Sequence, residues 1–105
     1  MEEDSLYIKH ILDAIIVIET YIENLSFETF SQNKLVQDGV IRELEIIGET
    51  VKRLSEDLKN LYLDIPWKDI AGMRDKLIHD YFGVDLEAVW RTAQEDLSAL
   101  KNVLS

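Results

Sequence analysis

Apolar residues recur every three or four positions along most of this chain, which is the spacing of α-helices buried along one side. Such stripes run from Ile8 to Leu25, from Val36 to Leu54 and from Leu86 to Leu104. Neither strand-like alternation nor an internal repeat interrupts them. The pattern predicts an all-α protein, an antiparallel four-helix-type bundle with short extra helices between the long ones.

Local signals predict where the helices begin and end. Ser5 is an expected N-cap for the first helix, and Asp85 for the last, because both side chains can accept a hydrogen bond from a helix's first turn. The expected helices span about residues 5–24, 26–30, 33–53, 55–62 and 67–82, with the last beginning after 85. We expect residues 1–105 to form a single domain.

The first helix carries more apolar surface than one stripe requires. Leu12, Ile16 and Tyr21 widen it beyond the face that one neighbouring layer would cover. Either this helix is the central core helix of the bundle, or a second subunit covers its other side.

The segment 67–82 holds an unusual concentration of chemically active side chains. It follows Pro66 and precedes Gly83, which are typical start and stop signals of a helix. Its polar residues include Arg74, Asp75, His79 and Tyr81.

The spacing of these residues limits what a single copy of the helix can do. Asp75 and His79 are four residues apart and therefore neighbours on a helix. Arg74 and His79 point about 140° apart, because a helix turns about 100° per residue. One continuous helix cannot aim both at a small target, so either the helix loosens near its end or a second chain completes the site.

These residue types suit metal-free cleavage of RNA. Asp75 can hold one ring nitrogen of His79, leaving the other to move protons. Arg74 offers a planar fork of donors that fits phosphate oxygens. Together they could support attack by a ribose 2′-hydroxyl on the adjacent phosphate. The structural alternative is a helix end with a buried Arg74–Asp75 ion pair.

The preceding long helix contributes two further candidates. Gly48 lies in its interior, where glycine usually marks a close approach between helices. Glu49 lies on a polar face with Arg42, Glu45 and Arg53. That face is either a solvated, salt-bridged surface or, through Glu49, a second shell that orders the Arg74 site.

Composition excludes several other kinds of site. The 105 residues include no cysteine, so neither disulfides nor thiolate metal sites can form, which suits a reducing cytoplasm. The two histidines are far apart in sequence, and we expect neither a metal nor a cofactor. No apolar run reaches membrane-spanning length, and the acidic N-terminus is unlike a signal peptide.

The net charge of −10 argues against a general nucleic-acid coat protein, and no DNA partner is expected. The charge is unevenly distributed. Residues 1–33 hold seven acids and one lysine, whereas residues 34–82 hold ten acids and eight bases. An anionic ligand near Arg74 is therefore compatible with the composition.

Several segments together resemble one known family. Residues 74–81, Arg-Asp-Lys-Leu-Ile-His-Asp-Tyr, resemble the Arg-x4-His-x-Tyr motif of HepT-like proteins in the HEPN superfamily. Ile-Gly-Glu-Thr at 47–50 is similar to the family's Ile-Gly-Glu-Ala segment. Pro-Trp at 66–67 and Gly-Met-Arg at 72–74 also match in order, and the similarity covers nearly the whole chain.

The resemblance implies a specific biology. HepT-like proteins are all-α homodimers whose paired motifs meet in a cleft, and they act as metal-independent ribonuclease toxins. The matching catalytic residues are Arg74 and His79, with Asp75 in a supporting position. The cognate antitoxin is a minimal nucleotidyltransferase that can transfer AMP to the motif tyrosine, here Tyr81. The alternative is a non-catalytic homodimeric module that binds such a nucleotidyltransferase.

Overall fold

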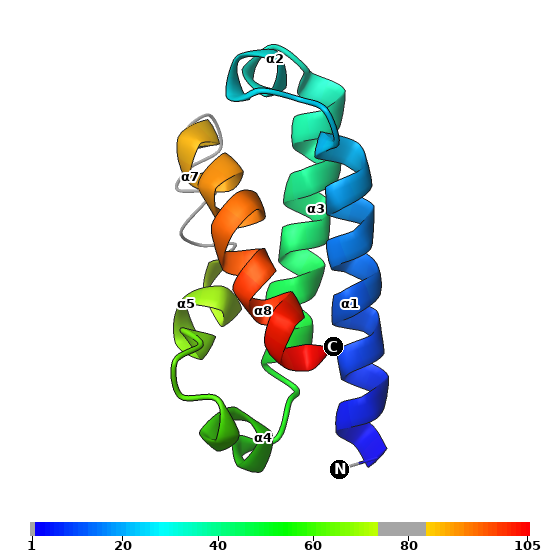
Figure 1. The fold of residues 1–105 in the computed structure, drawn as a ribbon, viewed down its shortest axis with the longest axis vertical. Helices are drawn as coiled ribbons and strands as arrows, with labels where there is room; N and C mark the ends of the chain where they lie inside the picture. Colours follow the sequence, from blue (N-terminus) through cyan, green and yellow to red (C-terminus); the bar gives the residue numbers. More distant parts are fainter. Residues whose placement is uncertain (1, 74–83) are drawn as a thin grey trace.

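The computed structural model describes residues 2–73 and 84–105, and every element over these ranges is a helix. Two long helices, α1 (Glu2–Ile22) and α3 (Lys34–Val51), lie side by side and antiparallel (Figure 1). The C-terminal helix, built from α7 (Leu86–Arg91), η1 (Thr92–Asp96) and α8 (Leu97–Leu104), packs across them. The prediction of an all-α fold is confirmed.

Three short helices complete the described part of the chain. Helix α2 (Phe27–Ser31) lies at the end of the bundle where α1 passes into α3, and α4 (Glu56–Leu61) lies at the opposite end (Figure 1). Helix α5 (Trp67–Ala71) then runs back along the lower part of α3 and packs against it.

The core joins the apolar stripes that the sequence predicted. One continuous cluster of buried side chains links α1, α3, α5 and the C-terminal helix. Its fully buried members on the three long elements include Ile11, Ile15, Ile18, Val40, Leu44, Ile47, Val89 and Leu100. Burial of such side chains supplies most of the stability of a helical bundle.

Four short polar side chains cap helices by accepting a backbone N–H three residues later. They are Ser26, Asn33, Ser55 and Asp85. Asp85 Oδ1 lies 3.1 Å from the backbone nitrogen of Ala88, so the expected cap of the last helix is confirmed.

The expected cap at Ser5 is wrong. Helix α1 already begins at Glu2, and Ser5 lies inside it. Acidic residues stabilise the first turn of a helix because its unpaired N–H groups carry partial positive charge. The run Glu2–Asp4 therefore lets the helix extend to the N-terminal side of Ser5.

The C-terminal helix is interrupted by a π-helical turn that the sequence pattern did not reveal. At η1 the N–H of Leu97 bonds to the carbonyl of Thr92, five residues earlier. The wider turn places both Thr92 and Ala93 in the interior. Single π-turns of this kind are often found at functional sites.

The helix expected over residues 67–82 is not continuous. Helix α5 ends at Ala71, and Gly72 has φ −90° and ψ 11°, away from α-helical geometry. The N–H of Gly72 bonds to the carbonyl of Lys68, which closes the last turn. The remainder of the expected helix, from residue 74, lies outside the described residues.

Candidate functional site

The four side chains predicted to carry the chemistry lie outside the described residues. Arg74, Asp75, His79 and Tyr81 therefore stay predictions, as does their convergence on one target. The structure instead describes what flanks this segment on either side, with Met73 just before it and Asp85 shortly after it.

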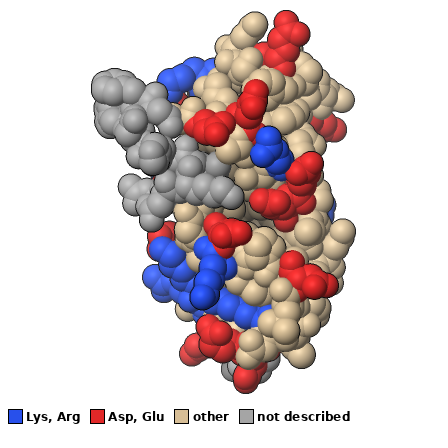
Figure 2. Space-filling model, turned by 90° about the vertical axis from the view of Figure 1, so that its left-hand side faces the viewer, with Lys and Arg blue, Asp and Glu red and all other residues tan. Residues whose placement is uncertain are grey.

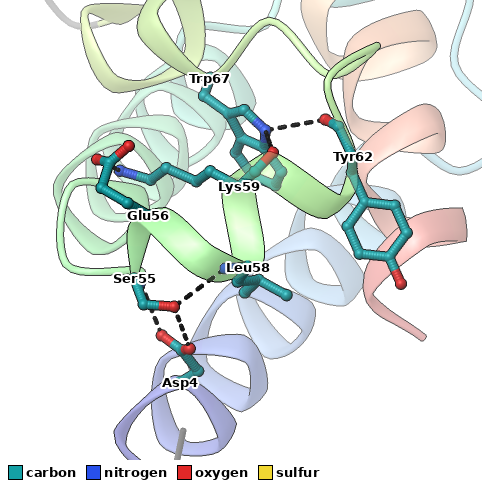
Figure 3. Close-up of polar contacts among 7 residues, drawn as sticks. All are labelled: Asp4, Ser55, Glu56, Leu58, Lys59, Tyr62 and Trp67. Carbon is teal, nitrogen blue, oxygen red and sulfur yellow. Dashed lines mark hydrogen bonds and ion pairs between the residues drawn. The ribbon is translucent and has the colours of Figure 1, made fainter.

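An indole hydrogen bond fixes the start of α5. Trp67 is buried, and its Nε1–H is shared between the carbonyl oxygens of Lys59, at 3.1 Å, and Tyr62, at 3.0 Å (Figure 3). Both acceptors lie at or just after the C-terminal end of α4, and each also accepts a backbone N–H, Lys59 from Tyr62 and Tyr62 from Ile65. Trp67 therefore ties the helix that leads into the predicted motif to the helix before it.

Gly48 allows α3 and α5 to approach closely. A Cβ atom at this position would lie 3.0 Å from the carbonyl oxygen of Ile70 and 3.4 Å from that of Ala71. Both oxygens belong to backbone, which cannot move without shifting α5. The close helix approach predicted from this glycine is confirmed, and α5 is the partner.

The π-turn faces the end of α5. Thr92 and Asp96 line a small hollow of about 10 Å³ together with Asp69, Ile70 and Met73. Met73 is almost fully buried, so the residue immediately before Arg74 is held in the core. The sequence did not predict this contact, because Thr92 is polar and does not belong to the apolar stripe of the C-terminal helix.

Aromatic contacts hold the other end of the segment. Trp90, one turn after the Asp85 cap, packs against Phe30 with ring centroids 5.1 Å apart and against Phe27 at 6.2 Å. Phe30 is fully buried. Phe27 and Phe30 therefore pin the short helix α2 against α7.

A carboxylate from α1 fixes the position of α4. Asp4 Oδ1 accepts the backbone N–H of Ser55 at 2.9 Å, and Oδ2 accepts the Ser55 hydroxyl at 2.6 Å (Figure 3). The Ser55 Oγ in turn accepts the N–H of Leu58 at 3.1 Å. These bonds from the Ser55 hydroxyl and N–H lower the pKa of Asp4 below its usual value, because they stabilise the ionised carboxylate.

Glu49, the possible second-shell residue, is largely exposed. Its carboxylate pairs with Lys52 Nζ at 3.1 Å within α3. It also lines a shallow hollow of about 340 Å³ that includes Arg42 and Arg53. These contacts fit a salt-bridged surface, and the role of Glu49 in ordering Arg74 stays a prediction.

Over the residues that the structure describes, no three His, Asp or Glu side chains are grouped as metal ligands. Within the same ranges, no helix has the length and apolar character needed to cross a membrane.

Comparison with known proteins shows to which family this chain belongs. The family model described as Ribonuclease HepT-like matches residues 11–105. The chain belongs to this family. The matched range includes α3, α5, the whole of residues 74–81 and the C-terminal helix, so the resemblance seen in short motifs extends to the chain as a whole.

Two relatives of this HepT-like chain match over most of its length and most of their own. A Thermococcus cleftensis protein named "Probable ribonuclease HepT" is 48% identical over 95 residues, which cover 90% of this chain and 86% of that protein. A Methanocaldococcus jannaschii "Putative RNase" is 43% identical, covering 90% of this chain and 78% of its own length.

A third relative is a larger protein. The M. jannaschii "Gamma-glutamylcyclotransferase and putative RNase" is 45% identical over 92% of the HepT-like chain, which spans only 44% of that protein. No solved structure matches the chain.

Proposed function

We propose that this HepT-like protein is a metal-independent endoribonuclease and the toxin of a toxin–antitoxin module. The observation that carries the proposal is the family match over residues 11–105, which contains Arg74 and His79 in the Arg-x4-His-x-Tyr arrangement. The buried anchors at Met73 and Trp67 support it, because a catalytic segment needs a fixed starting point. Because RNA is the proposed substrate, we expect the protein to act in the cytoplasm.

The proposed reaction is transfer of the phosphate within the RNA strand. His79 accepts the proton of a ribose 2′-hydroxyl, and the oxygen attacks the adjacent phosphorus. Arg74 stabilises the negative charge that builds up on the phosphate oxygens. The bond to the 5′-oxygen breaks, that oxygen takes up a proton, and a 2′,3′-cyclic phosphate remains. Asp75 orients the imidazole of His79.

The active form is proposed to be a homodimer. Arg74 and His79 point in different directions on one helix, so motifs from two subunits would supply the converging groups. Exposed apolar side chains on α1 support a subunit contact, since Leu6 is 56% and Ile16 52% exposed in the single chain. Light scattering that found a monomer at micromolar concentration would contradict the shared cleft.

Regulation is proposed to act on Tyr81. A cognate minimal nucleotidyltransferase would transfer AMP from ATP to the phenol oxygen, with pyrophosphate leaving. The added nucleotide is bulky and anionic, so it would block the cleft and repel RNA phosphate. Tyr81→Phe should abolish AMP incorporation and leave cleavage by the free toxin largely unchanged.

The decisive experiment is RNA cleavage by purified protein in the presence of EDTA. We expect products that end in 2′,3′-cyclic phosphate, and their loss in His79→Ala. If the wild-type protein and His79→Ala leave RNA equally intact, the ribonuclease proposal fails.

The net charge of −10 favours a second candidate, a non-catalytic homodimer that binds the nucleotidyltransferase. Co-purification with that partner and no cleavage of RNA would identify this role.

A further inference from the structure

A hollow of about 510 Å³ lies between α4 and α5, beside the end of α3. We call it the α4–α5 cavity. Its lining comes from α4, α5, the segment that joins them, and Lys52, which follows the end of α3. The lining residues that matter here are Lys52, Lys59, Asn60, Leu63, Pro66 and Lys68, with Trp67 and Ala71 from α5.

The cavity is positively charged on a strongly acidic protein. Lys52, Lys59 and Lys68 line it against two acids, Glu56 and Asp69, which leaves a net charge of +1. Figure 2 shows Lys and Arg side chains gathered on the face that carries α4 and α5. Three other hollows among the described residues are neutral or acidic, with net charges of 0, −1 and −2 from their lining residues. The cationic lining favours an anionic ligand at this place.

The lysines can exchange their present partners for a ligand. Lys52 pairs with the exposed Glu49, and Lys59 Nζ lies 3.8 Å from the exposed Glu56 carboxylate. Lys68 forms no ion pair with any residue that the structure describes. The exposed Lys52–Glu49 pair contributes about 0–1 kcal/mol, and Lys59, whose side chain is 16% exposed, makes only a long contact of 3.8 Å with Glu56, so phosphate oxygens can compete for both ammonium groups.

The walls beside these charges are apolar. Leu63 is 77% exposed, and Pro66 and one edge of Trp67 adjoin it in the lining. A large exposed apolar side chain in a cavity favours a ligand that carries an apolar surface. The Asn60 amide offers both a donor and an acceptor to a polar edge of the same ligand.

We propose that the α4–α5 cavity is a subsite for single-stranded RNA, in which lysines hold a phosphate and the apolar wall contacts a base. A nucleotide unit combines a phosphate charge with a flat apolar face and polar edges, which is the chemistry that this lining complements. The inference rests on the proposed ribonuclease function, and it assigns the cavity to a part of the strand outside the cleaved bond.

The position of the cavity along the chain suits this role. Ala71 forms part of the wall, and Arg74 follows three residues later. Three Cα–Cα steps span at most about 11 Å, so a strand seated in the cavity needs few further nucleotides to reach the predicted catalytic arginine.

The test compares two double variants with the same change in charge. Lys52→Gln/Lys68→Gln removes two lysines of the cavity, and Lys9→Gln/Lys34→Gln removes two exposed lysines elsewhere. Lys34 is a close match for Lys52, because the two are exposed lysines at opposite ends of α3 and each pairs with an acid of that helix. Thermal unfolding first establishes that both double variants fold as the wild type does.

Binding is measured by fluorescence anisotropy with a short 2′-O-methyl oligonucleotide, which has no 2′-hydroxyl to attack. The cavity variant should bind about tenfold more weakly, and its salt slope should fall by about 0.7, because the cavity holds one phosphate and each lost phosphate contact on a single strand removes about 0.7. The control variant should change by less than about twofold. In cleavage of unmodified RNA, the cavity variant should raise KM and leave kcat nearly unchanged.

The outcomes separate this inference from the proposed function. Equal RNA binding by the two double variants would overturn the subsite, even if the wild-type protein cleaves RNA. Lysine-dependent binding without any cleavage would support the subsite and overturn the nuclease. Lysine-dependent binding of AMP, with no binding of the oligonucleotide, would identify a free-nucleotide site and overturn the assignment to RNA.

Discussion

Replacing Gly48 by alanine tests whether the close contact between α3 and α5 positions the predicted catalytic segment. The added Cβ would lie 3.0 Å from the carbonyl oxygen of Ile70. An ordinary contact between such atoms begins at about 3.4 Å, so α5 must move away from α3 by a few tenths of an ångström. The displaced carbonyls immediately precede buried Met73 and the predicted motif.

Two opposing effects set the size of the change. Alanine is about 1 kcal/mol more favourable than glycine in the interior of a helix. Forcing an extra carbon into a packed interface typically costs about 1–3 kcal/mol. We therefore expect Gly48→Ala to lower the free energy of unfolding by about 1 kcal/mol, since the atoms it meets are backbone and cannot rotate away.

Gly39→Ala is the matched control, because it makes the same change in the same helix. Its Cβ would lie 2.8 Å from Cε2 of Tyr21, which is a closer contact. That ring is partly exposed, however, and a side chain can turn aside at little cost. We expect Gly39→Ala to be neutral or to stabilise the protein by up to about 1 kcal/mol.

Urea unfolding followed by circular dichroism measures both variants, and RNA cleavage at a temperature where both are folded gives the functional readout. Gly48→Ala should lose activity beyond its loss of folded protein, while Gly39→Ala should keep it. If Gly48→Ala is as stable as Gly39→Ala and cleaves RNA normally, the contact with Ile70 does not position the segment.

Three further substitutions, one of them with a control, test other contacts that hold the helices together. Asp4→Asn should destabilise the protein near neutral pH, and the difference from wild type should shrink as pH falls from the usual Asp pKa towards the lowered pKa of the folded state. This follows because a carboxylate whose pKa is lowered in the folded state contributes stability only while it is ionised, and unfolding curves at pH 7 and about pH 3 check it. Trp67→Phe should cost about 1–2 kcal/mol in urea unfolding, since it leaves two carbonyls at the end of α4 without their indole donor. Leu100→Ala should cost about 2–5 kcal/mol because Leu100 is fully buried, whereas Leu35→Ala, at an exposed position, should change the stability by less than about 0.5 kcal/mol.

The features that sequence predicted well are those set by local periodicity and local caps. Ile11, Ile15 and Ile18 are all buried as their spacing indicated, because a helix repeats its inward face every three or four residues. The cap at Asp85 was predicted for a similar reason, since its partner N–H lies only three residues away.

The features that sequence missed depend on partners that are distant along the chain. The Asp4 carboxylate bonds to Ser55, 51 residues later, and nothing in either local sequence reveals that pair. The indole of Trp67 finds its acceptors only once α4 is folded beside it. The π-turn shifts the helix register by one residue, which ordinary helical periodicity cannot represent. The burial of Thr92 was unforeseen because its side chain is polar.

The same difference between local signals and distant partners applies to the candidate site. Gly48 predicted a close approach between helices from the sequence. Only the structure identified the carbonyl oxygens of Ile70 and Ala71 as the atoms that it approaches. The roles of Arg74 and His79 rest on their pattern and on the family match, and they stay predictions. The cationic cavity was not predicted, because Lys59 and Lys68 come from two separate helices and Lys52 from the end of a third.

The distribution of charge explains how so acidic a protein could bind RNA. Helix α1 belongs to the strongly acidic first third of the chain, and Figure 1 places it on the opposite side of α3 from α5. A helix with its side chains is about 10 Å across, while charges are screened over about 8 Å at physiological ionic strength. Repulsion from the acids along most of α1 is therefore weak at the α4–α5 cavity, whereas Asp4, which bonds to Ser55 beside α4, lies closer. The cations near the motif, rather than the net charge of −10, should decide whether an RNA strand is bound.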